Sequence, residues 1–290
     1  MEIIELQPKE TTSIIDQLKQ HSKDSLVLCF VGVGSAWARK NANTSLIVVK
    51  NGLTVLIDLG TNVPVELERM KVDWLDFDYY HFTHSHSDHV GGVEELLLKL
   101  RYIKRKKARV IITNEYQQIL WNKTLKGGCE INEVGLLRFT DLVDAVKPKW
   151  VSGHPRDQYH ITLDGILDFD IFRTLHVPGD VNSWDKVLFW STGIMLDGKV
   201  IFTADTRFDL SLFEHLNFDN VDVIFHDCQL SGPGTVHATY EELSRLMPSY
   251  KERMFLTHYG DNFDKFDPQS DGFRGFAKPW VIYKFQQYKK

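Results

Sequence analysis

Four of the chain's 12 histidines fall within one short stretch, HFTHSHSDHVGG, at residues 81–92. His84, His86, Asp88 and His89 follow the pattern H-x-H-x-D-H at the expected end of a strand. Imidazole nitrogens and carboxylate oxygens are good ligands for zinc-like ions. In an extended chain the side chains of His84 and His86 share a direction, while Asp88 and His89 lie on the following turn. A chance cluster of surface histidines is the alternative, and the regular spacing favours a metal site.

The elements that must position these residues are apolar runs rich in β-branched and aromatic residues, mostly bounded by Gly, Asn or Asp. Strands are expected at 25–34, 44–60, 77–85, 109–113, 167–177, 186–206, 221–227 and 253–260. Helices are expected at 11–21, 64–71, 91–104, 114–121 and 239–247. Asn-Gly at 51–52 and Asp-Gly at 197–198 predict hairpin turns. Early hairpins followed by alternating strands and helices predict an α/β fold, with two sheets packed together and helices outside.

The length and composition predict one large domain across residues 1–290, since 43% of the residues are hydrophobic. Residues 122–165 are the least regular part and contain several glycines and prolines. We expect them to form an insertion or a cap over the site.

The charge balance argues against long nucleic acids as partners, because the net charge of −5 supplies no basic field. One basic run, at 99–109, holds seven Lys or Arg residues and either contacts RNA phosphates or forms a solvated helix end. The three scattered cysteines indicate a reducing compartment, and no signal peptide or membrane span is recognisable. We therefore expect a cytoplasmic protein.

The H-x-H-x-D-H run resembles the signature of the metallo-β-lactamase superfamily. The resemblance implies an αβ/βα sandwich of two mixed sheets with outer helices and a two-metal site along one edge. It also implies three further ligands at the ends of later strands, which match His176 in FRTLHVPGD, Asp205 in VIFTADTR and His258 in MFLTHYG. In the implied arrangement one metal binds His84, His86 and His176, the other binds Asp88, His89 and His258, and Asp205 bridges them. Asp180 is the alternative to His176, because some branches place this ligand after the Pro-Gly pair.

Three further stretches resemble the ribonuclease Z-like phosphodiesterase branch: GVGSAWARKNANTSLIV at 32–48, FTADTR at 202–207, and IFHDCQL with VHATYEEL between 224 and 243. In that branch the histidine that matches His237 lies over the metals and serves phosphoryl chemistry. His226 is either a second catalytic candidate or a buried support beside Asp227. Only 28 residues separate His176 from Asp205, which leaves no room for the tRNA-gripping arm of ribonuclease Z.

A short member without the arm resembles cyclic nucleotide phosphodiesterases, in particular the phage-type anti-Pycsar enzymes. The resemblance implies hydrolysis of a small 3′,5′-cyclic nucleotide by a homodimer that holds two divalent ions, with zinc expected and manganese as the alternative. Asp88 would orient the attacking water, and His237 would protonate the leaving ribose oxygen. The residues that bind the substrate are not predicted. The aromatic tail at 273–285 either serves an interface, stacks a base or packs on its own domain. A tRNA 3′ endonuclease and a catalytically silent nucleotide-binding scaffold are the rival functions.

Overall fold

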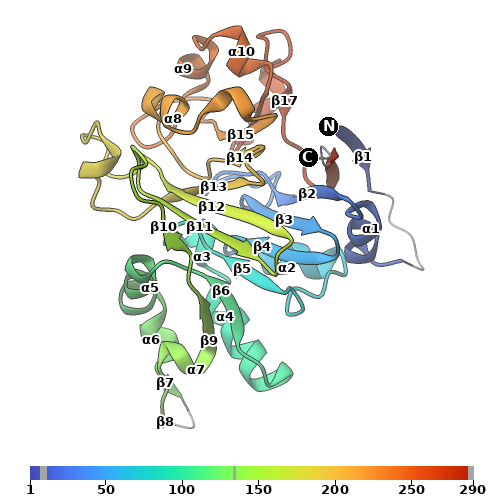
Figure 1. The fold of residues 1–290 in the computed structure, drawn as a ribbon, viewed down its shortest axis with the longest axis vertical. Helices are drawn as coiled ribbons and strands as arrows, with labels where there is room; N and C mark the ends of the chain where they lie inside the picture. Colours follow the sequence, from blue (N-terminus) through green and yellow to red (C-terminus); the bar gives the residue numbers. More distant parts are fainter. Residues whose placement is uncertain (7–11, 133–134, 287–290) are drawn as a thin grey trace. The chain divides into compact units, whose positions relative to one another are not determined.

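The computed structural model describes residues 1–6, 12–132 and 135–286, and the chain divides into two compact units. Unit 1 comprises Met1–Gly32, Ala42–Lys147 and Lys278–Lys290, and unit 2 comprises Val33–Asn41 and Pro148–Ala277. Within the described ranges each unit contains one large mixed sheet of eight strands (Figure 1). The predicted fold class, α/β with two mixed sheets, is confirmed.

The sheet of unit 1 joins an antiparallel half to a parallel half, in the order β1-β18-β2-β3-β4-β5-β6-β9. Strands β2 to β4 are buried along their whole length, as the unbroken apolar runs in their sequence require. Burying each Val, Leu or Phe side chain in such a core stabilises the fold by about 1.5–3 kcal/mol. The strands are β1 (Glu2–Glu5), β2 (Ser25–Gly32), β3 (Ser45–Lys50), β4 (Leu53–Ile57), β5 (Tyr79–His81), β6 (Ala108–Ile111), β9 (Val143–Val146) and β18 (Val281–Gln286), with a separate β7 (Ile131–Asn132) and β8 (Gly135–Leu136) pair.

The helices of unit 1 lie between these strands and mostly match the predicted positions. They are α1 (Ile14–His21), α2 (Val63–Arg69), α3 (Ser87–Val90), α4 (Val93–Lys99), α5 (Asn114–Leu120), α6 (Lys126–Cys129) and α7 (Phe139–Leu142), with π-helical turns at Leu100–Lys104 and Trp121–Leu125. The expected helix at 11–21 begins at Ile14 after the N-cap Ser13, and its first predicted residue lies outside the described ranges.

The sheet of unit 2 runs in chain order from β10 to β17, antiparallel as far as β14 and parallel from β14 onward. Its strands are β10 (Lys149–Trp150), β11 (Gln158–Leu163), β12 (Leu167–Arg173), β13 (Thr192–Leu196), β14 (Val200–Phe202), β15 (Val223–Asp227), β16 (Met254–Thr257) and β17 (Gly275–Phe276). The helices are α8 (Leu210–His215), α9 (Tyr240–Ser244) and α10 (Pro248–Lys251), with single 3₁₀ turns at Trp184–Lys186, Phe218–Asn220 and Phe263–Lys265.

Both predicted hairpin turns are present. Asn51 and Gly52 have φ angles of 47° and 83°, and Asp197 and Gly198 have 51° and 63°. Positive φ at both central residues suits the right-handed twist of the flanking strands, and Asn-Gly and Asp-Gly tolerate it best. These turns join β3 to β4 and β13 to β14.

Residues 122–165 are more regular than their composition indicates. β9 pairs with β6 at one edge of the unit 1 sheet, and β11 pairs with β12 in the unit 2 sheet. The green part of Figure 1 shows the helices α5, α6 and α7 grouped with β7 and β8. That this part caps the site stays a prediction.

The aromatic tail packs on its own domain. β18 lies between β1 and β2, and Tyr283 and Phe285 are buried. Tyr283 packs edge-on against Phe30 of β2, with ring centroids 6.2 Å apart. The buried rings of β18 therefore fit the third alternative, packing on the chain's own sheet.

The basic run at 99–109 is largely neutralised by carboxylates. Three lysines of the run form salt bridges with carboxylates. The distances from Nζ to oxygen are 2.6 Å for Lys99–Glu95, 2.7 Å for Lys104–Asp73 and 2.9 Å for Lys106–Asp76. These paired charges leave little field for RNA phosphates, so the run fits a solvated helix end and its connection to β6.

Among the described residues, we find no helix with the length and apolar character needed to cross a membrane.

Candidate metal centre

In unit 1 the H-x-H-x-D-H residues gather on the loop and short helix α3 that follow β5. Nε2 of His84 lies 3.1 Å from Nδ1 of His86, and Nε2 of His89 lies 3.4 Å from Oδ2 of Asp88. Nitrogens that bind one tetrahedral zinc ion at about 2.0–2.1 Å lie roughly 3.3 Å apart. The spacing therefore suits two ligands of one ion.

Asp58, which follows β4 directly, fixes the protons of this group. Its carboxylate accepts hydrogen bonds from the Thr83 amide and from the Thr83 hydroxyl, each at 2.8 Å. Because that hydroxyl donates its only hydrogen to Asp58, it must accept from Nδ1 of His84, 3.1 Å away. The lone pair of the His84 ring is then on Nε2, the atom that faces His86.

Asp58 orients His89 in the same way. Its Oδ2 lies 2.7 Å from Nδ1 of His89, and both side chains are fully buried. The adjoining backbone also holds the loop, because Leu59 N donates to the His89 carbonyl at 2.8 Å. Gly60 permits this approach, since a Cβ there would lie 2.0 Å from the Asp88 carbonyl oxygen.

In unit 2 the parallel strands β14, β15 and β16 bring a second group together. The carboxyl ends of parallel strands meet at one edge of a sheet, where ligands commonly bind. Asp205 follows β14, Asp227 ends β15 and His258 follows β16. With His237, each of these residues offers one ligand atom, and these atoms lie within 4.8 Å of one another. Asp205 faces His258 in this group, with Oδ1 3.5 Å from Nε2 of the ring.

His176 follows β12 and lies next to Asp205 of this group. Nε2 of His176 is 3.7 Å from Oδ2 of Asp205. Nδ1 of His176 lies 2.7 Å from the Val236 carbonyl oxygen, which can only accept, so Nδ1 carries the proton. Nε2 therefore has the lone pair that a ligand needs. Asp180, the alternative ligand, is exposed on the loop beyond the Pro-Gly pair. This geometry favours His176.

His237 is half-buried and pairs with the buried Asp227 just ahead of helix α9, which begins with a capping box between Thr239 and Glu242. Nδ1 of His237 lies 2.7 Å from Oδ2 of Asp227. Burial alone would lower the pKa of His237, but the Asp227 carboxylate outweighs it and raises that pKa above its usual value. Burial likewise opposes the charge on Asp227, yet His237 and His258 hold the pKa of Asp227 below its usual value.

His226 lies outside this group. Its side chain points to the face of β15 opposite Asp227, as consecutive residues of a strand do, and it stacks on Phe213 of α8 with the rings 9° from parallel. Its Nδ1 donates to the Asp227 carbonyl at 2.7 Å, and burial lowers its pKa. This fully buried position fits the second alternative, a support for β15 beside Asp227.

The donor chemistry of both groups fits divalent ions. Asp205 and Asp227 are almost fully buried, and buried carboxylates are costly unless a cation or hydrogen bonds compensate them. Imidazoles with their Nδ1 protons held by Asp58 and by Val236 are the usual form of zinc-ligating histidines. Asp58 and Asp227 were not predicted from the sequence. Their position at the end of apolar strands, in VLIDLG and VIFHD, is the signal that indicates them.

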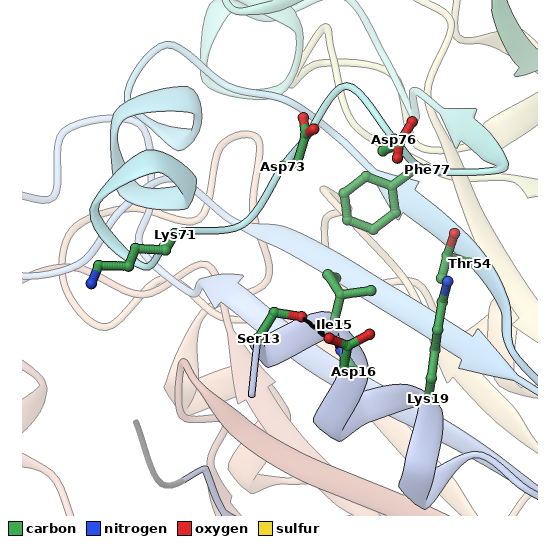
Figure 2. A pocket seen from close by; sticks show the side chains of 9 residues that line it. All are labelled: Ser13, Ile15, Asp16, Lys19, Thr54, Lys71, Asp73, Asp76 and Phe77. Carbon is green, nitrogen blue, oxygen red and sulfur yellow. Dashed lines mark hydrogen bonds between the residues drawn. The ribbon is translucent and has the colours of Figure 1, made fainter. Parts of the chain in front are cut away.

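A cavity of about 250 Å³ lies in another part of unit 1, and none of the predicted ligands lines it. Figure 2 shows its lining side chains, which come from α1, β4 and the segment after α2: Ser13, Ile15, Asp16, Lys19, Thr54, Lys71, Asp73, Asp76 and Phe77. Two of its carboxylates, Asp73 and Asp76, already pair with lysines. We assign it no function.

Comparison with solved structures defines the class of protein. The metallo-β-lactamase fold protein YhfI from Bacillus subtilis superposes with a TM-score of 0.64 at 15% identity, over 90% of this chain and 99% of its own. A diphosphatase of the PhnP family gives 0.63 at 16% identity, over 90% and 98%. Human tRNase Z, short form, gives 0.61 at 14% identity, over 89% and 98%. The chain therefore has the metallo-β-lactamase fold, as the histidine pattern predicted.

Sequence comparison is more specific. The family model described as "Anti-Pycsar protein Apyc1" matches residues 26–283. The Apyc1 of Paenibacillus xerothermodurans is 30% identical over 264 residues, which is 91% of this chain and 99% of that protein. The Apyc1 of Bacillus phage vB_BsuM-Goe3 is 32% identical over 252 residues, 84% of this chain and 92% of that protein. The chain belongs to the anti-Pycsar Apyc1 family, which confirms the resemblance found in its motifs.

Proposed function

We propose that this protein is a metal-dependent phosphodiesterase that hydrolyses 3′,5′-cyclic nucleotides, with cyclic pyrimidine nucleotides as the preferred substrates, to linear nucleoside monophosphates. The observation that carries the proposal is the gathering of Asp205, Asp227, His237 and His258 at the ends of β14, β15 and β16. Family membership supports the substrate class, since the relatives are named anti-Pycsar proteins.

The proposed ligand set combines both groups of residues around two divalent ions. His84, His86 and His176 would hold one ion, Asp88, His89 and His258 the other, and Asp205 both. Zinc suits the imidazole-rich donors, and manganese is the alternative. Bound ions of this kind lower the pKa of water towards about 7 and offset the charge of a phosphate.

The protein's own residues would then supply orientation and a proton. Asp88 lies on α3 with its carboxylate next to His89 and would orient the attacking water as well as bind metal. His237 would donate a proton from Nε2 to the ribose oxygen as the bond between phosphorus and that oxygen breaks. The Asp227 carboxylate 2.7 Å from Nδ1 supports this assignment, because it favours the protonated ring and raises the pKa of His237. We place His226 outside the chemistry because its ring faces Phe213.

The tRNA endonuclease is the rival function, and human tRNase Z shares the fold. The short segment between His176 and Asp205 argues against it, because it ends in the β13–β14 hairpin and has no room for an arm. The retained ligand residues argue against a silent scaffold. Homodimer assembly and a cytoplasmic location remain parts of the proposal, and family membership supports the former only by analogy.

A panel of 3′,5′-cyclic nucleotides tests the proposal. The purified protein, freed of metal with a chelator and then given Zn²⁺ or Mn²⁺, should convert cyclic CMP and cyclic UMP to linear monophosphates. Chromatography of the products identifies the bond that breaks. Failure of every cyclic nucleotide in the metal-loaded protein would refute the proposal.

A further inference from the structure

One loop of unit 2 is fastened to the strand end that carries His258. Gly34 pairs with Tyr259 in a parallel bridge, Tyr259 N donates to the Val33 carbonyl, and Ser35 N donates to the Tyr259 carbonyl, both at 3.2 Å. Tyr259 is the residue directly after His258. The backbone of residues 33–35 is therefore fixed beside a proposed metal ligand.

The far side of the same loop is held by Asp261. Its carboxylate accepts the backbone amides of Arg39, at 2.8 and 3.0 Å, and of Lys40, at 2.9 Å. These amides lower the pKa of Asp261, so the carboxylate stays charged well below neutral pH. Ala38 is buried beneath the loop. The loop is thus tied down at both ends, and its tip has a defined position.

The tip of this loop presents Trp37 to solvent, with 85% of the residue exposed. Tryptophan is highly buried on average, because its indole has a large apolar area. Within residues 1–6, 12–132 and 135–286, the indole has no ring contact or hydrogen bond that would account for its place. A rigid loop that holds an indole in water is organised for a ligand that the chain itself does not supply.

Trp37 is also within reach of the site. It lies two residues beyond Ser35, and two residues span at most about 7 Å. Ser35 is hydrogen-bonded next to His258. A nucleotide whose phosphate lies at His258 would therefore be long enough to place its base near the indole of Trp37.

We propose that Trp37 binds the substrate by stacking on its nucleobase. The inference rests on the proposed function, and it adds the base-recognition residue that neither the motifs nor the ligand set contains. A flat indole face stacks on any base, which makes Trp37 a source of affinity for nucleotides in general, with finer base choice left to hydrogen bonds. The exposed cationic side chain of Arg39 beside it would favour the approach of an anionic substrate.

The test compares Trp37→Ala and Trp37→Phe on two substrates. One is cyclic CMP, and the other is methyl riboside 3′,5′-cyclic phosphate, which keeps the ribose and the phosphate ring but has no base. We expect Trp37→Ala to lower kcat/KM for cyclic CMP by roughly 5- to 150-fold, mainly through KM, and to leave the baseless substrate unchanged. Trp37→Phe should recover most of the loss. Trp150→Phe, which changes the exposed tryptophan of β10, is the matched control and should behave like wild type.

Equal losses on both substrates would overturn the proposal, because they would mean that Trp37 only orders its loop. A variant that keeps wild-type kinetics would overturn it as well. Tryptophan fluorescence separates this inference from the proposed function. The measurement is the quenching of that fluorescence by a slowly hydrolysed phosphorothioate analogue of cyclic CMP. Quenching that is present in wild type and lost in Trp37→Phe upholds stacking even if the protein hydrolyses neither substrate. Quenching that is absent in wild type, or unchanged in the variant, contradicts it.

Discussion

Asp58 shows how a residue outside the proposed ligand set can orient the histidines within it. One carboxylate bonds to the Thr83 hydroxyl and to Nδ1 of His89, and through Thr83 it also fixes the proton of His84. The H-x-H-x-D-H spacing indicated these ligand candidates from the sequence alone. It did not reveal Asp58, because this residue follows a different strand, β4, and its proximity to the histidines depends on the pairing of β4 with β5.

Replacement of Asp58 by Asn should weaken metal binding by about 10- to 100-fold, the usual effect of losing an outer partner of a ligating histidine. An amide in this position no longer holds the Nδ1 protons of His84 and His89 as a carboxylate does. Competition with a chelating dye measures the affinity. Asp78→Asn is the control, since Asp78 accepts hydrogen bonds from Thr54 and touches no ligand. Equal affinities of Asp58→Asn and wild type would show that the ligands orient themselves.

His237 is the residue whose role is chemical in the proposed mechanism. His237→Ala should keep its metal content and fold while kcat for a cyclic nucleotide falls by about 10²–10⁴-fold. The loss should be smaller for a p-nitrophenyl phosphodiester, whose leaving group needs no proton. Rapid-quench or steady-state kinetics with both substrates decides the point. The same loss on both would mean that His237 grips the phosphate instead of donating a proton.

At the scale of elements, the sequence predicts best where the pattern is local. The hairpin turns, the apolar strands β2 to β4 and the capping box of α9 all follow from residues that are close in the chain. β1, β11 and β18 were missed for a physical reason. β11 alternates between polar and apolar residues only weakly, and β18 is defined by pairing with β1 and β2, more than 250 residues earlier.

Helix α8 is anchored by a buried ion pair that the sequence did not indicate. Asp209, its N-cap, accepts the Ser211 amide at 3.0 Å and lies 2.6 Å from the guanidinium of Arg156. Burial opposes the charge of Asp209, but Arg156 and Ser211 outweigh it and hold the pKa of Asp209 below its usual value. A carboxyl group with a lowered folded-state pKa stabilises the fold above its unfolded pKa, about 3.9, and loses that contribution as the pH falls through the folded value.

Asp209→Asn should therefore destabilise the protein at pH 7, because loss of one partner of a buried pair typically costs about 3–5 kcal/mol. The difference from wild type should shrink as the pH falls below about 4, where the wild-type carboxyl also loses its charge. Urea unfolding at a series of pH values measures this. Asp73→Asn removes one partner of an exposed pair with Lys104 and should change stability by less than about 1 kcal/mol. A pH-independent difference for Asp209→Asn would show that its charge is not the stabilising feature.

At the scale of the whole molecule, the fold defines the structural class of the protein, and the sequence defines its family. The metallo-β-lactamase fold is shared with proteins of about 15% identity and unlike printed functions, so the fold alone leaves the substrate open. Family membership narrows the substrate to cyclic nucleotides, while each unit supplies its own group of side chains that could hold a metal ion. The seven-ligand arrangement follows from the resemblance and not from spacing, because ligands on separate strands have no fixed distance in the sequence.

The most direct test of the proposed activity gives both candidate substrates to one metal-loaded preparation of the protein. Cyclic CMP and a precursor tRNA are incubated with the same protein, and its metal content is determined by elemental analysis. We expect rapid conversion of cyclic CMP to linear monophosphate, an intact tRNA, and loss of both metal and activity in Asp205→Ala. Efficient cleavage of the tRNA while cyclic CMP stays intact, or an Asp205→Ala variant that keeps two tightly bound ions, would contradict this expectation.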